Sequence, residues 1–153
     1  MQIKKTLILS LLLGFIVASC GSSSGNEEKL VNNSANLSTK ERQYFANGKK
    51  RYATYCASCH MEQGEGLGKL IPPLQKADYL LADVPGAARV IKHGLKGPIQ
   101  VNGTEYNQPM PANPRLTNLE IAELLTFIAN SWGNEHGGVT TEEVATALEV
   151  TED

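Results

Sequence analysis

The stretch Cys56-Ala57-Ser58-Cys59-His60 holds two of the three cysteines and one of the three histidines in the chain. A Cys-x-x-Cys-His spacing is typical of the covalent attachment of c-type haem. Two rival uses of paired cysteines are a structural zinc site and a redox-active dithiol, and each needs further features in the sequence. The rest of the chain therefore decides among three kinds of site.

Cys56, Cys59 and His60 supply only three of the four ligands that a structural zinc ion takes. The two other histidines, His93 and His136, stand alone in the sequence. A thioredoxin-like dithiol lies in an alternation of strands and helices, whereas this cysteine pair follows a predicted helix. Covalent haem c fits best, because the two cysteines would form thioether bonds and His60 would offer its imidazole to the iron.

Met110 is the predicted sixth ligand of that iron. It lies in the segment Pro109-Met110-Pro111, where the prolines restrict the backbone on both sides of the thioether. Met61 directly follows His60 and is not expected to reach the opposite face of the haem. His93 competes for the position, but it lies at the end of a predicted helix, where a histidine has a favourable capping role.

The first 19 residues predict a signal peptide. A charged start is followed by an apolar run over 7–17, and this run is too short to span a bilayer, which takes about 20 residues. The stretch from Val17 to Cys20 resembles the lipobox of bacterial lipoproteins, in which cleavage precedes a lipidated cysteine. Residues 20–39, rich in Ser, Gly and Asn, then predict a flexible tether to the membrane.

Charge argues against nucleic acid as a partner. Removing residues 1–19 takes two lysines from the 14 basic residues, so 12 remain against 16 acidic residues, a net charge of −4. Residues 40–135 are predicted to form the haem domain. Residues 136–153 form an acidic tail in which the segment 140–150 is either a short helix or solvated chain.

Helices are predicted at both ends of the domain. Ser38 with Glu41, and Thr117 with Glu120, form capping boxes ahead of apolar stripes. The first stripe is Phe45, Gly48, Tyr52 and Tyr55, and its mid-helix glycine indicates a backbone passing close by. The second stripe is Ile121, Leu124, Leu125, Ile128 and Trp132, with Gly133 placed to end the helix.

The segment between these helices is mostly loop. Shorter helices are expected at 76–82 and 85–93, the second ended by Gly94. No hairpin and no period-two run is predicted. Such a domain has a thin core, which a large cofactor would help to fill.

The chain from Lys40 to Asn134 resembles class I monohaem cytochrome c, and the lipobox-like stretch from Val17 to Cys20 implies its bacterial lipoprotein form. The resemblance is carried by the first helix with its glycine, the haem motif, a proline pair, the methionine loop and the final helix, namely Gly48, Tyr52, Cys56, Cys59, His60, Pro72, Pro73, Met110 and the segment 117–132. It implies an all-α fold of helices and loops wrapped around one covalent haem c.

The same resemblance assigns further roles. It implies that Gly48 packs on the last helix, at Phe127, Ile128 or Trp132. The Pro72 carbonyl is implied to hydrogen-bond the His60 imidazole, which would orient the ring and raise its basicity. Tyr106 and Arg115 are implied to approach the haem propionates.

These features predict a one-electron carrier rather than an enzyme, with no small-molecule substrate. It would be lipid-anchored through Cys20 outside the cytoplasm, on the periplasmic side, between a respiratory dehydrogenase or quinol-oxidising complex and a terminal oxidase or reductase. The alternatives are a catalytic or gas-sensing haem with a labile sixth ligand, and a fixed haem subunit of a larger respiratory complex. Five lysines would form either a basic docking rim or an ordinary surface: Lys49, Lys69, Lys76, Lys92 and Lys96.

Overall fold

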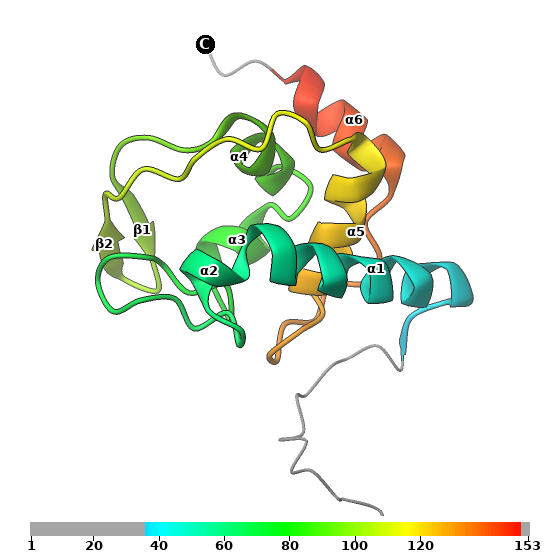
Figure 1. Cartoon of the computed structure of the whole chain (residues 1–153), viewed down its shortest axis with the longest axis horizontal. Coiled ribbons are helices and arrows are strands. Elements are labelled where there is room, and N and C mark those ends of the chain that lie inside the picture. The colour runs from blue at the N-terminus through cyan, green and yellow to red at the C-terminus, as the bar shows by residue number, and fades with distance from the viewer. Residues whose placement is uncertain (1–35, 151–153) are drawn as a thin grey trace, which may run out of the picture.

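The computed structural model describes residues 36–150, and two crossing helices organise them (Figure 1). Helix α1 spans Thr39–Tyr55 and helix α5 spans Asn118–Ile128. Both predicted capping boxes are confirmed, because in each the Ser or Thr side chain and the Glu side chain bond the other residue's backbone N–H. Each helix therefore begins at the residue that its capping sequence specifies.

The inward face of α1 largely follows the predicted stripe. Phe45, Gly48 and Tyr52 are buried, and the two aromatic rings pack against Phe127 of α5. Gly48 lies against α5, and its contact with Phe127 agrees with the partner that the resemblance implied. Tyr55 was wrongly included in the stripe, since 47% of its surface is exposed at the last turn of α1.

Three short helices lie between α1 and α5. A single turn, α2 (Ala57–His60), carries the cysteine and histidine motif. The two expected middle helices are present as α3 (Asp78–Ala82) and α4 (Ala87–His93). Gly94 ends α4 with a positive φ of 78°, as its position predicted.

A β-hairpin corrects the expectation of an all-α domain without strands. Strands β1 (Ile99–Val101) and β2 (Thr104–Tyr106) pair antiparallel, with Val101 opposite Thr104. Asn102 and Gly103 connect them with φ values of 51° and 73°. Positive φ at both turn residues is the geometry that Asn-Gly favours, so this dipeptide was an overlooked hairpin signal.

Helix α5 ends earlier than predicted. Its last helical residue is Ile128, and Trp132 lies beyond it with a positive φ of 56°. Polar side chains take the carbonyls of the last turn: Asn130 Nδ2 donates to Thr126 O and Ser131 Oγ donates to Phe127 O. Because side chains satisfy these carbonyls, the helix stops before Gly133.

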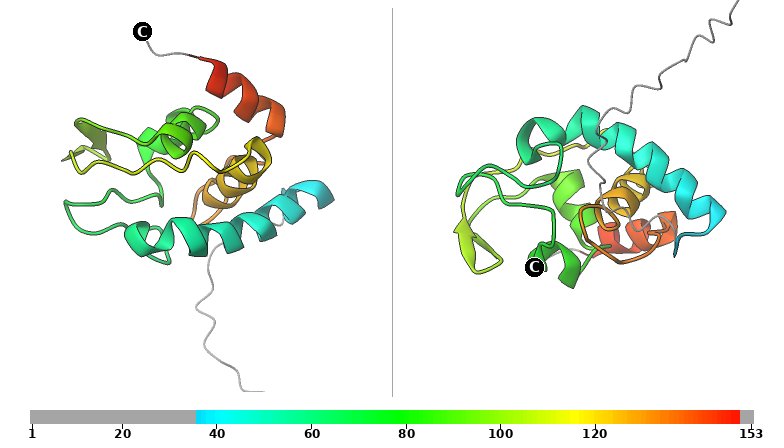
Figure 2. Two further views of the ribbon diagram at one scale, coloured as in Figure 1. Left: turned by 45° about the horizontal axis from the view of Figure 1, so that its top comes forward. Right: turned by 90° about the horizontal axis from the view of Figure 1, so that it is seen from below.

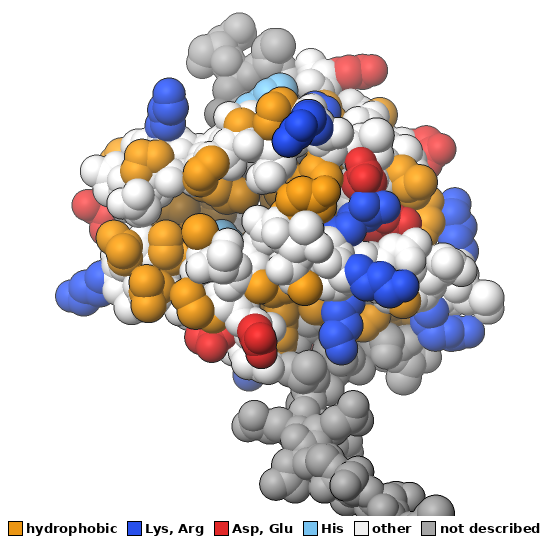
Figure 3. All heavy atoms as spheres, in the orientation of Figure 1, with side chains coloured by type: hydrophobic (Ala, Val, Ile, Leu, Met, Phe, Trp, Pro, Cys, Tyr) orange, Lys and Arg blue, Asp and Glu red, His pale blue; other side chains and the backbone are white. Residues whose placement is uncertain are grey.

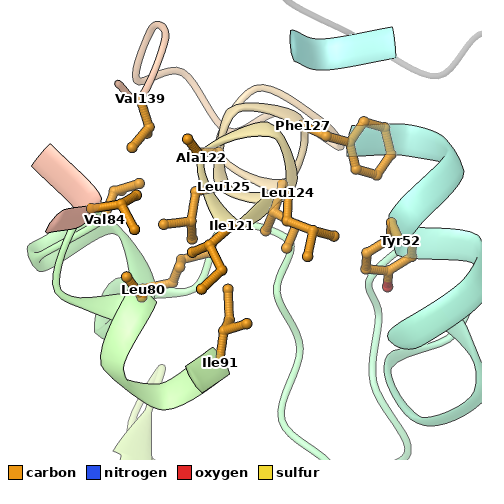
Figure 4. Close-up of a cluster of buried hydrophobic side chains, with 14 of the residues drawn as sticks. Tyr52, Leu80, Val84, Ile91, Ile121, Ala122, Leu124, Leu125, Phe127 and Val139 are labelled. Atoms are coloured by element: carbon orange, nitrogen blue, oxygen red, sulfur yellow. The ribbon is translucent and has the colours of Figure 1, made fainter. Parts of the chain in front are cut away.

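The acidic segment after residue 139 forms helix α6 (Thr141–Glu149) rather than solvated chain. A third capping box, Thr140 with Glu143, begins it, and Val144 and Ala147 are buried on its inner face. It contacts α4 and α5, and Figure 2 shows it beside α5. The core therefore surrounds α5, whose side chains reach α1 on one side and the α3–α4 region on the other (Figure 4).

The predicted signal peptide (1–19), Cys20, and most of the tether (20–39) lie outside the described residues, as do the last three residues of the tail. Among residues 36–150, no helix combines the length and the apolar character needed to cross a bilayer.

Candidate functional site

An apolar cavity of about 270 Å³ lies between α2, α4, α5, the hairpin and the loop that carries Met110. Its lining is dominated by aliphatic and proline side chains, with few polar groups. Figure 3 shows a hollow between groups of hydrophobic side chains, on the side of the molecule where the hairpin lies. Such a cavity suits a mostly apolar ligand.

Both cysteines of the motif line this cavity. Cys56 follows α1 directly, and its carbonyl accepts from the N–H groups of Cys59 and His60, which forms the single turn of α2. Both thiols are free, with Cys56 half-buried and Cys59 exposed. Burial, and then the neighbouring Cys59, raises the pKa of the Cys56 thiol to about 12. A buried thiol with a raised pKa is mostly protonated.

His60 is buried in the wall of the cavity and is held by Pro72. Its Nδ1 lies 3.1 Å from the Pro72 carbonyl oxygen, the hydrogen bond that the resemblance implied. Because a carbonyl only accepts, Nδ1 carries the proton and Nε2 keeps a free lone pair. Burial lowers the pKa of His60, and the bond to Pro72 partly opposes this shift. The bond to Pro72 thus orients the ring and leaves Nε2 as the nitrogen that is available to donate to a metal.

Met110 also lines the cavity, and its backbone is fixed by a partner that the sequence did not reveal. Its N–H and carbonyl pair with Leu95, at 2.9 and 3.0 Å. A Cβ at Gly94 would lie 2.6 Å from the Met110 carbonyl oxygen, so glycine at 94 both ends α4 and permits this approach. The neighbouring Asn113 N–H donates to Ile91 O, which ties the same loop to α4.

Of the other candidate residues, one lines the cavity and the rest lie elsewhere. Tyr106 lines the cavity and its hydroxyl donates to Gly68 O at 3.3 Å, whereas Arg115 is exposed and is not part of the lining. His93 is exposed on α4 and belongs to a different surface groove. Met61 lies at the end of α2, where its carbonyl accepts from the Tyr52 hydroxyl at 2.6 Å.

The cavity lining also includes two polar residues that the sequence analysis did not identify, Tyr79 and Gln108. Within residues 36–150, no group of three or more His, Cys, Asp or Glu side chains is arranged to share a metal ion. Of the five lysines considered for a rim, none lines the cavity. Lys92 is engaged by the carbonyls of Pro114 and Leu116.

Comparison with known families gives a match to the cytochrome c model over residues 45–132, more than half of the chain and the whole of this site. The chain belongs to the cytochrome c family. It accordingly binds covalently attached haem c and functions in electron transfer.

Individual relatives of this cytochrome fall into two groups. Cytochrome c-552 of Thermus thermophilus is 39% identical over 93 residues, which are 58% of this chain and 70% of the relative. A second cytochrome c-552 from the same species matches equally, over 62% of its length. The cytochrome c subunit of alcohol dehydrogenase (quinone) from Gluconacetobacter polyoxogenes is 32% identical over 103 residues, but this chain spans only 22% of that subunit.

The residues around the cavity fit the cofactor of the family. Two cysteine thiols, a neutral histidine and a methionine thioether all line one apolar space. These donors are the set that holds haem in cytochromes c.

Proposed function

We propose that the protein is a class I monohaem cytochrome c that carries single electrons. Cys56 and Cys59 would hold the haem through thioether bonds, and His60 and Met110 would be the ligands of its iron. The observation that carries this proposal is the hydrogen bond of His60 to the Pro72 carbonyl beside the cavity that Met110 also lines. It leaves Nε2 of a neutral ring as the donor atom.

When bound, the haem supplies a reversible one-electron couple. The protein would hold both donors on hydrogen-bonded backbone: the Pro72 carbonyl orients the imidazole, and Met110 pairs with Leu95. Histidine with methionine raises the potential of the couple relative to two histidines. Two protein ligands to the iron, His60 and Met110, would suit a carrier rather than a catalytic or gas-sensing haem. Tyr106 and Arg115 remain the candidates for contacts with the propionates.

We further propose that the carrier is exported and anchored by lipid on Cys20, with the haem domain on the periplasmic side. The tether 20–39 would concentrate the domain near membrane-bound redox partners, so that a weak docking surface suffices. These partners would be a dehydrogenase or quinol-oxidising complex on one side and a terminal oxidase or reductase on the other.

A second candidate function is a fixed haem subunit of a respiratory complex. It is favoured by the 32% identity to the cytochrome c subunit of alcohol dehydrogenase (quinone). Gentle solubilisation of membranes followed by purification would separate the two functions, since a subunit would stay with stoichiometric partners and a carrier would not.

Absorption spectra of the haem-loaded protein test the site. We expect a low-spin spectrum with the weak ferric band of methionine ligation and no response of the reduced protein to carbon monoxide. In Met110→Ala the band should be lost and the reduced protein should bind carbon monoxide. Met61→Ala is the matched control and should keep the band. Rapid carbon monoxide binding by the unmodified protein would instead support a sensing or catalytic haem.

Membrane anchoring has its own test. Cys20→Ala should release the protein from membranes into the soluble fraction while leaving its haem spectrum unchanged. A variant that stays bound to membranes would contradict the lipoprotein proposal.

A further inference from the structure

The side chain of Asn134 joins the end of α5 to the loop that carries Pro72. Asn134 is fully buried, at 0% exposure. Its Oδ1 accepts from the Lys76 N–H at 2.6 Å, and its Nδ2 donates to Leu74 O at 3.0 Å and to Ile128 O at 2.8 Å. One side-chain amide therefore bonds the loop backbone on both sides of Gln75 and connects it to α5.

The segment fixed in this way begins two residues after Pro72. Hydrogen bonds back to Gly64 close the loop between them. The N–H groups of Leu74 and Gln75 both donate to the carbonyl of Gly64, at 2.7 and 3.0 Å. Pro72 lies within this closed loop, and its carbonyl accepts a hydrogen bond from His60 Nδ1. Leu67 and Ile71 also pair their backbones just before Pro72, so the Asn134 amide holds the end of a loop that is already bonded to itself.

The turn after α5 contacts the same loop at a second point. Trp132 lies over Gly64, where a Cβ would be 2.6 Å from ring carbons. The ring also packs on Tyr52, at 5.0 Å between centroids, and the Tyr52 hydroxyl donates to Met61 O. The loop is thus held at its start by packing and at its end by the Asn134 amide.

We propose that Asn134 is a positioning residue, which sets the Pro72 carbonyl and through it the orientation of the His60 imidazole. The inference rests on the proposed function, in which His60 is an axial ligand. A residue that hydrogen-bonds the loop backbone acts on the iron site through the ligand's own hydrogen-bond partner, an arrangement that tunes metal sites elsewhere.

Asn130 provides a matched control within the same turn. It is also an almost fully buried asparagine, at 2% exposure, and its Nδ2 also donates to two carbonyls. Those carbonyls belong to Thr126 and Gly137, so Asn130 joins α5 to the segment before α6 and not to the Pro72 loop. Replacing either asparagine removes a satisfied buried amide, but only Asn134 leads to His60.

The test compares Asn134→Ala with Asn130→Ala in the haem-loaded protein. Two readouts report on the ligand: solvent exchange of the His60 Nδ1 proton by NMR, and the reduction potential. In Asn134→Ala we expect exchange to accelerate about tenfold or more. The potential should rise, because a weaker bond to Pro72 makes the imidazole a poorer donor and disfavours the ferric state. In Asn130→Ala both readouts should stay near those of the unmodified protein, corrected for lost global stability.

Equal effects of the two variants on exchange and potential would overturn the inference. A further measurement needs no variant. In the unmodified protein, the exchange rates of the Lys76 amide proton and the His60 Nδ1 proton should depend on denaturant in the same way, because one opening event exposes both. Exchange of Lys76 through a local opening that leaves the His60 proton protected would also overturn it. Failure of the proposed function is distinct, since the unmodified protein would then lack iron-shifted His60 signals altogether.

Discussion

Gly48 of α1 lies directly against Glu123 of α5, where a Cβ at position 48 would be 1.9 Å from the Glu123 carbonyl oxygen. The two helices therefore approach at backbone distance, as only glycine allows. The crossing also positions the site. Cys56 follows α1 in the chain, while Leu125 and Ile128 of α5 form part of the cavity wall, so the close approach sets the cysteines against that wall.

Gly48→Ala should therefore destabilise the protein by about 3 kcal/mol or more, because neither backbone can yield without opening the helix crossing. At an unobstructed helix position the same replacement would be stabilising. The free energy of unfolding by denaturant titration measures the effect, with the exposed Lys50→Ala as the control. A variant as stable as the unmodified protein would contradict the close crossing.

A charged network reinforces the same crossing. Arg51 of α1 bonds Glu123 at 2.6 Å and Glu120 at 2.7 Å, and Asn47 Nδ2 donates to the other oxygen of Glu123 at 2.8 Å. The side chain of Glu123 is 5% exposed, whereas that of Glu120 is 26% exposed. Charge pairs lose strength as solvent screens them, so the two pairs should differ.

A double-mutant cycle tests this difference. Combining Arg51→Ala with Glu123→Ala should give a coupling energy of about 1–3 kcal/mol, while Arg51→Ala with Glu120→Ala should give about 0.2–1 kcal/mol. Unfolding free energies of the single and double variants supply both numbers. The reverse order of coupling would show that burial does not govern this network.

The sequence was informative where a short motif carries its own geometry. Each capping box joins residues three apart, so its hydrogen bonds form wherever the helix forms, and those of α1 and α5 were predictable. The Gly48 crossing was predictable for a similar reason, since an interior helix glycine requires an explanation in close packing. The Cys-x-x-Cys-His spacing likewise brought both cysteines and His60 together around the single turn α2, beside one cavity.

Contacts between segments distant in the sequence were harder to predict. Nothing near Met110 in the sequence points to Leu95 as its backbone partner, because that pairing depends on how the loop returns along α4. The early end of α5 was missed because Asn130 and Ser131 interrupt an apolar pattern that otherwise continues to Trp132. The hairpin was missed for a different reason: Asn102-Gly103 is a strong turn signal, but its flanking strands have only three residues each.

The start of α6 should respond to acid. Hydrogen bonds from the backbone N–H and then the hydroxyl of Thr140 lower the pKa of Glu143 below its ordinary value of 4.5. A carboxyl with a lowered pKa stabilises the fold above its unfolded pKa, and this contribution is lost as pH falls through the folded pKa. Glu143→Ala should cost about 1 kcal/mol at pH 7 and progressively less below pH 4.5. Glu142→Ala, on the same turn, controls for charge at the helix start, and a cost that does not vary with pH would contradict the capping role.

Gly66 and Gly68 form a natural matched pair within the loop 61–76 that carries Pro72. Both have positive φ, 69° and 54°, so replacement by alanine strains the backbone similarly at each. Their surroundings differ, because a Cβ at Gly66 would lie 2.4 Å from Ile71 O and 2.7 Å from the Pro72 carbonyl oxygen, whereas one at Gly68 would meet nothing within 4 Å.

Gly68→Ala should therefore lose about 1 kcal/mol of stability and keep its reduction potential, since only backbone strain is added. Gly66→Ala should lose a further 1–3 kcal/mol or so and should show a raised potential, because relief of the clash moves the Pro72 carbonyl away from His60 Nδ1. Denaturant titration and redox titration of both haem-loaded variants measure the two effects. Equal potentials in the two variants would mean that the carbonyl can move without weakening its bond to the imidazole, and that the loop does not tune the iron through His60.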